Sequence, residues 1–160
     1  MGTKSSNSVK NWLIEEKLLV KELQKETMNY FFVIQFPDSH HFMQVFQPKN
    51  KEDLTVITCE TNIDEPHKKA ISKLPEKKKN EFLFDLKSAL NQMGVVFDLS
   101  ITEKGLESYM VLDQIYADGL SKDRLLNCIN AVFRAKLQGV FEIQKRFGNS
   151  NNQKETFTIP

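Results

Sequence analysis

Three strand-like segments follow one another in the first half of the chain, and short polar turns join them. Apolar and β-branched residues dominate residues 28–36, 41–47 and 53–60, whereas residues 37–39 (PDS) and 48–53 (PKNKED) have the composition of turns. Links this short join antiparallel neighbours, because a parallel pair needs a crossover of about a dozen residues or more. The chain is therefore constrained to an antiparallel sheet.

Helical periodicity occurs before, between and after the strands. Apolar residues recur at spacings of three and four in several segments. These segments are residues 8–17, 66–74, 75–94 and about 121–147. Ser8 and Ser121 have the side chain of an N-cap residue, and Gly94 and Gly148 follow the last helical residues. Residues 18–24 fit either a longer first helix or an extended lead-in to the sheet.

Two more strand patterns follow the middle helix, over residues 95–102 and 106–116. The order α-βββ-α-ββ-α predicts an α+β fold with an antiparallel sheet of about five strands and three main helices. No internal repeat or long linker divides the chain. We expect one domain over residues 8–147, a flexible N-terminus over 1–7 and a mobile tail over 148–160.

The first predicted strand is apolar on both faces. Tyr30, Phe32 and Ile34 fall on one face of residues 28–36, and Phe31 and Val33 fall on the other. A strand with two apolar faces has both of them covered. Either the fold itself or an oligomer partner supplies the second cover.

No motif of an enzyme, a cofactor or a metal site is present. The glycines stand singly, without the spacing of a phosphate-binding loop, and neither CxxC nor HExxH occurs. His40 and His41 point to opposite faces of a strand, and His67 could approach them only through the fold. We therefore predict turn and surface histidines rather than a zinc site. We expect no cofactor, no metal and no catalytic residue, and hence a non-enzymatic protein. An enzyme whose site is assembled from dispersed carboxylates stays as a further hypothesis.

Three other reactive side chains have structural interpretations. Cys59 and Cys128 lie in apolar contexts and are predicted to be buried, reduced thiols. Asp113 shares a predicted strand face with apolar residues. We expect it at an edge of the sheet or hydrogen-bonded to a neighbouring turn.

Charge and hydropathy favour a cytoplasmic protein without a membrane partner. The formal net charge is +1, so no global field attracts polyanions. No apolar run has the length of a signal peptide core or of a membrane span. Lysines are concentrated between Lys68 and Lys79, and nucleic-acid or polyanion binding through them is the alternative hypothesis. A solvated helix surface is favoured, because the cluster has no arginine and no interleaved aromatic residue.

Two helices carry more apolar surface than one core needs. Phe84 points away from the apolar stripe of residues 75–94, and Leu83 widens the apolar sector toward it. In the last helix, Leu137 and Phe141 extend the apolar arc beyond the roughly 100° that a surface helix buries. These four residues are the interface candidates, and we expect a homodimer.

The element order resembles the type III secretion chaperone-like fold, which is also that of the bacterial YbjN family. More closely, the chain resembles a family of uncharacterised archaeal proteins. The matching phrases are VKNWLIEEK (9–17), QPKNKEDLTVIT (47–58), NEFLFDLKSAL (80–90) and IYADGLSKDRLLNCINAVFRAKL (115–137). The resemblance covers most of residues 8–147.

The resemblance implies a function by analogy. Secretion chaperones are dimers that hold an unfolded segment of a client protein, which implies a protein-binding or chaperone-like adaptor domain here. The secretion chaperones tend to be acidic, whereas this chain is nearly neutral. We therefore transfer none of their binding residues, and a fold by itself does not determine function.

Overall fold

The computed structural model describes residues 4–149. Helices and strands follow one another along the chain in groups. They are α1 (Lys4–Glu15), β1 (Leu19–Glu22), β2 (Met28–Gln35), β3 (Phe42–Pro48), β4 (Leu54–Asn62), α2 (Glu65–Ser72), α3 (Glu76–Gln92), β5 (Val96–Thr102), β6 (Gly105–Tyr116), the short 3-10 helix η1 (Ala117–Gly119) and α4 (Lys122–Phe147).

The six strands form one antiparallel sheet in the order β1-β2-β3-β4-β6-β5. The predicted α+β class is confirmed. The sheet has six strands where about five were expected, because β1 pairs with β2 through Leu19 and Ile34. The helices number four in the described chain, because Pro75 separates α2 from α3 and serves as the N-cap of α3. Strands β1 and β5 are the edges of the sheet.

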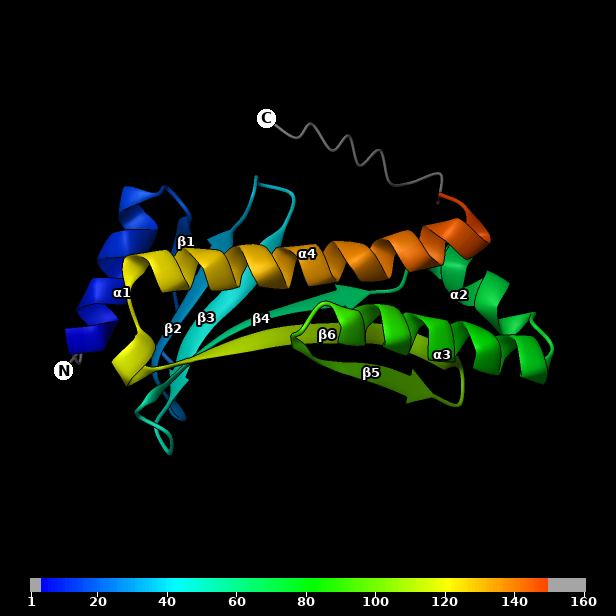
Figure 1. The fold of residues 1–160 in the computed structure, drawn as a ribbon, viewed down its shortest axis with the longest axis horizontal. Helices are drawn as coiled ribbons and strands as arrows, with labels where there is room; N and C mark the ends of the chain where they lie inside the picture. Colours follow the sequence, from blue (N-terminus) through cyan, green and yellow to red (C-terminus); the bar gives the residue numbers. More distant parts are fainter. Residues whose placement is uncertain (1–3, 150–160) are drawn as a thin grey trace.

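Helix α4 is the element around which the other helices gather. It lies across β4 and β6, and α1, α2 and α3 each contact it (Figure 1). The helices therefore cover one face of the sheet, with α1 against β2 at one end and α3 beside β5 at the other. Helix α4 starts after its N-cap Ser121, whose side chain accepts a hydrogen bond from the Arg124 N–H.

The core lies between this helical layer and the sheet. Its largest fully buried side chains come from both layers, as expected for a two-layer domain. They include Phe32, Ile34, Met43, Ile57 and Tyr109 from the sheet and Leu13, Phe82, Leu86, Leu90, Leu125 and Ile129 from the helices. Cys59 and Cys128 are both free and buried, which confirms the structural interpretation of the two thiols.

The N-terminal region differs from the prediction. The first helix begins at Lys4, so that Ser8 lies inside it, and residues 4–7 are helical. The helix ends at Glu15, and Lys17 takes a left-handed backbone conformation with φ 57°. The open question over residues 18–24 is resolved, because β1 is extended. Residues 1–3 and 150–160, which include most of the predicted tail, lie outside the described residues.

Candidate interaction surfaces

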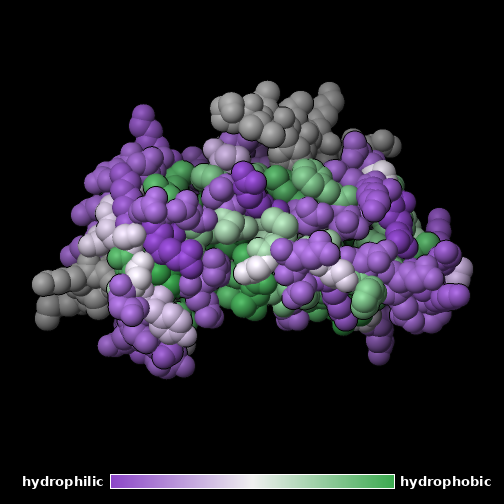
Figure 2. All heavy atoms as spheres, viewed as in Figure 1, coloured by the Kyte–Doolittle hydropathy of each residue, from purple (hydrophilic) through white to green (hydrophobic). Residues whose placement is uncertain are grey.

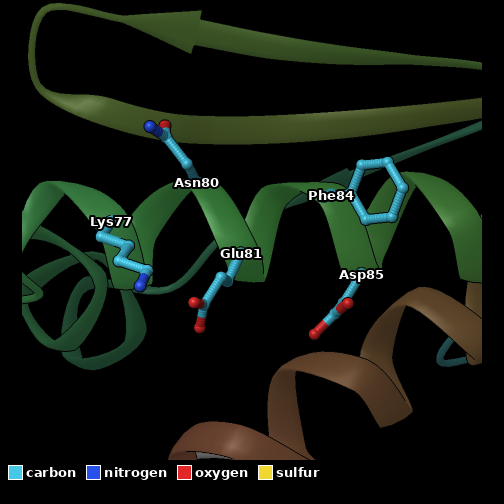
Figure 3. Close-up of a pocket in the computed structure, with 5 residues that line it drawn as sticks. All are labelled: Lys77, Asn80, Glu81, Phe84 and Asp85. Atoms are coloured by element: carbon cyan, nitrogen blue, oxygen red, sulfur yellow. The ribbon is translucent and has the colours of Figure 1, made fainter.

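The most exposed large apolar side chain is on α3. Phe84 keeps 69% of its surface accessible, as predicted for an interface candidate. It lines a shallow open hollow of about 750 Å³ with Lys77, Asn80, Glu81 and Asp85. In Figure 3, Asn80 and Phe84 point toward the β5–β6 hairpin, whereas Glu81 and Asp85 point toward α4. Phe84 is thus an apolar centre with a polar rim.

Leu83, the second candidate on α3, has a different role. It is half-buried and packs against the edge of the core. The neighbouring strand β5 is also thinly covered, because Phe97 and Leu99 are only half-buried although their pairing partners Val111 and Tyr109 belong to the core. Leu83 therefore supports the position of α3, and Phe84 is the residue that faces outward.

An ion pair holds α3 against α4. Arg146 of α4 donates to Asp85 at 2.7 Å, and the Phe82 and Phe147 rings meet edge to face with centroids 5.0 Å apart. These contacts lie on the side of α3 next to α4. Lys77, Glu81 and Lys87 take no part in these contacts, and all three are exposed.

Leu137 and Phe141 lie on another surface, along α4. Leu137 is half-buried and Phe141 is 46% exposed. At 3.6 residues per turn, Phe141 lies roughly 140° around α4 from Arg146, which contacts α3. Figure 2 shows apolar residues in the middle of the helix-bearing face, over α4 and between α4 and α3, with hydrophilic residues on either side. The four candidates thus form two separate patches.

The second face of the sheet is a further surface, and none of the four predicted interface residues lies on it. Tyr30, Phe32 and Ile34 belong to the core, so the alternate residues Phe31 and Val33 point to the face without helices. We call this the open sheet face. It carries Phe31, Val33, Phe46, Val56, Leu112 and Val96 from five strands. Of these side chains Val96 is exposed, Val33, Phe46 and Leu112 are half-buried, and Phe31 and Val56 are buried.

These side chains are in register across the sheet. Phe46 pairs with Phe31 on one side and with Val56 on the other, and the rings of Phe31 and Phe46 stack with centroids 5.6 Å apart. Leu112 pairs with Val96, which is 57% exposed. In the sequence, this surface was indicated by the apolar residues on both faces of residues 28–36. That pattern predicted that both faces are covered, but not which face the helices of the chain cover.

The buried histidine His41 corrects a prediction. His40 is exposed, as expected of a surface histidine, but His41 is only 4% exposed and contacts the Phe133 ring edge to face. Lys136 lies 2.6 Å from its Nδ1 and donates to it. Burial, and secondly the charge of Lys136, lower the pKa of His41. The neutral imidazole is therefore the form that the fold favours.

Neither thiol has the environment of a nucleophile. The Cys128 Sγ lies 3.3 Å from Asp113 Oδ2, and burial together with this carboxylate raises the pKa of Cys128 to about 12. Burial also raises the pKa of Cys59. Asp113 lies on β6, where it pairs with Ile57 of β4, and it accepts from the Gln114 N–H as well as from Cys128. The pairing of β6 with β5 ends one residue earlier, at Leu112, so Asp113 has a neighbouring strand on one side only, which fits the predicted edge position.

The third histidine joins two helices. The side chain of Asp64 caps α2 by accepting from the His67 N–H, and its Oδ1 lies 2.9 Å from His67 Nδ1. The His67 Nε2 donates to the Gly148 carbonyl at 2.8 Å, just beyond the end of α4. His67 is buried, which also differs from the predicted surface position.

The lysine cluster is divided between α2 and α3. Lys68 lies 2.7 Å from Glu107, and this hydrogen bond raises the pKa of Lys68. Lys78 lies 3.5 Å from Glu81. Carboxylates are therefore interleaved with the lysines, which weakens the local positive field.

Two kinds of feature are absent from the described residues. Between residues 4 and 149, no group of three or more histidine, cysteine, aspartate or glutamate side chains is arranged to hold a metal ion. Over the same range, no helix combines the length and the apolar character needed to cross a bilayer.

Fold and surfaces together define an α+β domain with helices on one face of an antiparallel sheet and exposed apolar side chains on both faces. The chain belongs to the family of uncharacterised conserved proteins DUF2299, whose model matches residues 5–143. A crystal structure of an uncharacterised protein from Methanothermobacter thermautotrophicus is similar at 41% identity and a TM-score of 0.86, over 90% of this chain and 99% of the other. These two findings confirm the resemblance to an uncharacterised family with an archaeal member.

A more distant similarity is to the crystal structure of YbjN from E. coli. It has 9% identity and a TM-score of 0.44, and it covers 87% of this chain and 88% of the other. No curated protein matches the chain.

Proposed function

We propose that the chain is a non-enzymatic protein-binding adaptor domain that acts as a homodimer and holds an apolar segment of a client protein. The open sheet face is the observation that carries this proposal. Five of its strands contribute apolar side chains, and no helix of the described chain lies over them. Large apolar patches with a polar rim are typical of surfaces that bind other proteins.

The composition of this face favours a peptide-like client over a small molecule. The apolar residues stand among Gln44, Thr58 and Gln114, which are their register neighbours. Interfaces combine an apolar centre with polar side chains that bind the backbone of the partner. The three best-formed hollows of the described residues are lined by residues outside this face, and small ligands prefer concave sites.

Two features support a role without catalysis. The thiols of Cys59 and Cys128 both have raised pKa values, so they are protonated near neutral pH and are poor nucleophiles. The Lys136 ammonium donates a hydrogen bond to His41 Nδ1 inside the fold, so both groups are used in a structural contact. The reactive groups therefore contribute to structure, and the exposed apolar surfaces are left to carry the function.

Photo-crosslinking in the native cytoplasm tests the proposal. p-Benzoylphenylalanine replaces Phe46 on the open sheet face in one variant and Phe141 on α4 in a matched control. We expect the Phe46 variant to form a discrete adduct with another protein, in a yield well above that of the control. A second substitution, Val33→Asp, lies on the same face and should abolish the adduct while the circular dichroism spectrum stays unchanged.

Two outcomes contradict the proposal. One is an adduct with RNA in place of protein, which would favour the alternative of nucleic-acid binding. The other is the absence of any protein adduct from Phe46 in a variant that folds normally. Equal adducts from Phe46 and Phe141 would also remove the open sheet face as the client surface.

A further inference from the structure

We propose that a second copy of the chain docks on α3, with the two α3 helices antiparallel and the twofold axis at Phe84. This inference rests on the proposed homodimer and assigns its surface. Phe84, which lies at the axis, is the most exposed large apolar side chain in the described chain. A twofold contact places Phe84 against Phe84 of the partner, so that one substitution changes the interface twice.

The residues around Phe84 form a stripe along the outside of α3. At 3.6 residues per turn, they lie within about 60° of Phe84 on either side. The stripe consists of Lys77, Asn80, Glu81, Phe84, Lys87, Ser88 and Asn91. All are exposed except Ser88, which is half-buried. Asn80 and Ser88 are small enough to let a second helix approach the ring.

The charges of this stripe are self-complementary. Glu81 precedes Phe84 by three residues and Lys87 follows it by three. When two such helices are antiparallel about Phe84, each Glu81 lies at the level of Lys87 of the partner. Opposite charges therefore meet twice, once on each side of the ring pair, and a parallel arrangement would instead align like charges. This pattern identifies a second copy of the chain as the occupant.

The rest of the molecule leaves this stripe uncovered. Asp85, the neighbour that could repel a partner, is paired with Arg146 on the side toward α4. Lys78 is the only described cation within 4.0 Å of Glu81, in an exposed contact of 3.5 Å that contributes little. Glu81 is therefore available to a partner, and the anchored α3 presents Phe84 without reorganisation.

A charge exchange tests the surface. We expect Glu81→Lys and Lys87→Glu each to weaken dimerisation by about tenfold or more, because like charges then face each other twice. The double variant E81K/K87E restores opposite charges and should return the dimer dissociation constant to within about threefold of the wild type. Analytical ultracentrifugation gives the constants, and circular dichroism checks the fold of each variant.

Cysteine crosslinking gives an independent measure of the axis. The variant Phe84→Cys should form a disulfide-linked dimer under mild oxidation, because the two positions meet at the axis. Phe141→Cys, on α4, is the matched control and should remain uncrosslinked at the same concentration. The native thiols are buried and do not compete.

The outcomes separate this inference from the proposed function. A stable wild-type dimer whose single charge variants stay dimeric, or whose double variant is not restored, overturns the α3 contact while leaving the adaptor function standing. A strictly monomeric wild type at micromolar concentration overturns the dimer itself. The Phe46 photo-adduct is unaffected by either result, since it reports on the opposite layer of the fold.

Discussion

The ring of Tyr109 lies directly beneath the backbone of α4 at Gly139. Its hydroxyl donates to the Lys136 carbonyl at 2.6 Å, and a Cβ atom added at Gly139 would lie 2.5 Å from the ring carbon Cζ. Glycine in the middle of a helix is unfavourable by about 1 kcal/mol relative to alanine. Here its lack of a side chain lets a central helix approach a central strand.

Substitution of Gly139 by alanine therefore destabilises the protein although alanine is the better helix former. The added methyl group forces the ring or the helix to move, and overpacking of a core destabilises by about 1–3 kcal/mol. Urea unfolding measures the difference. Arg134→Ala, at an exposed position of the same helix, is the control and should change the free energy of unfolding by less than about 0.5 kcal/mol. An unchanged midpoint for Gly139→Ala would contradict the close approach.

The pH dependence of stability should depend on His41. Its pKa is lowered in the fold, first by burial and then by Lys136, so the unfolded chain takes up a proton at a higher pH than the folded one. The stabilising contribution is complete above the unfolded pKa of about 6.5 and is lost as the pH falls toward the folded pKa. Urea unfolding at several pH values between 5 and 8 should therefore show weaker stability on the acidic side.

A neighbouring residue provides the control for this prediction. His41→Gln should flatten the dependence of the unfolding free energy on pH between 5 and 7. His40→Gln should leave that dependence as it is, because His40 is exposed. Identical pH profiles for the two variants would show that the acid sensitivity comes from another group.

Both native thiols should resist modification in the folded protein. Cys59 is 1% exposed and Cys128 is fully buried, and the pKa of Cys128 is raised to about 12. We expect a disulfide reagent at pH 8 to label them only as fast as the chain unfolds, and completely in denaturant. The variant Arg134→Cys adds a thiol at an exposed position of α4, and this thiol should react within the mixing time. Rapid labelling of a native thiol would require a different environment around α4.

Polyanion binding should be weak and independent of the lysine cluster. Lys68 and Lys78 are paired with carboxylates, and the net charge of the chain is only +1. We expect elution from immobilised heparin at low salt, unchanged when Lys77, Lys78 and Lys79 are replaced by glutamine. A clear shift of the triple variant to lower salt would favour the nucleic-acid hypothesis.

Local signals determined most of the elements that could be predicted. Ser121 begins α4 because its side chain binds an N–H three residues later, and this interaction is contained in a few residues. Phe84 could likewise be placed outside by helical spacing alone. The start of α1 was missed because Ser8 has the side chain of an N-cap residue, whereas the helix begins four residues earlier, at Lys4.

Long-range contacts account for what could not be predicted. The extended form of β1 depends on its pairing with β2, and the burial of His41 depends on Phe133 and Lys136, which lie far along the chain. Sequence alternation indicated that β2 has two apolar faces, but the position of α4 decides which of them stays open. For that reason none of the predicted interface residues lies on the open sheet face.

The position of α4 at the end of the described order has a consequence for synthesis of the chain on the ribosome. Leu125, Ile129 and Val132 from this helix complete the core, so a nascent chain that lacks them has a sheet whose core face is covered only by α1, α2 and α3. Pairing of β4 with β6 also waits for residues 105–116 to emerge. During translation, the growing chain itself therefore presents the kind of exposed apolar strand that adaptor and chaperone proteins bind.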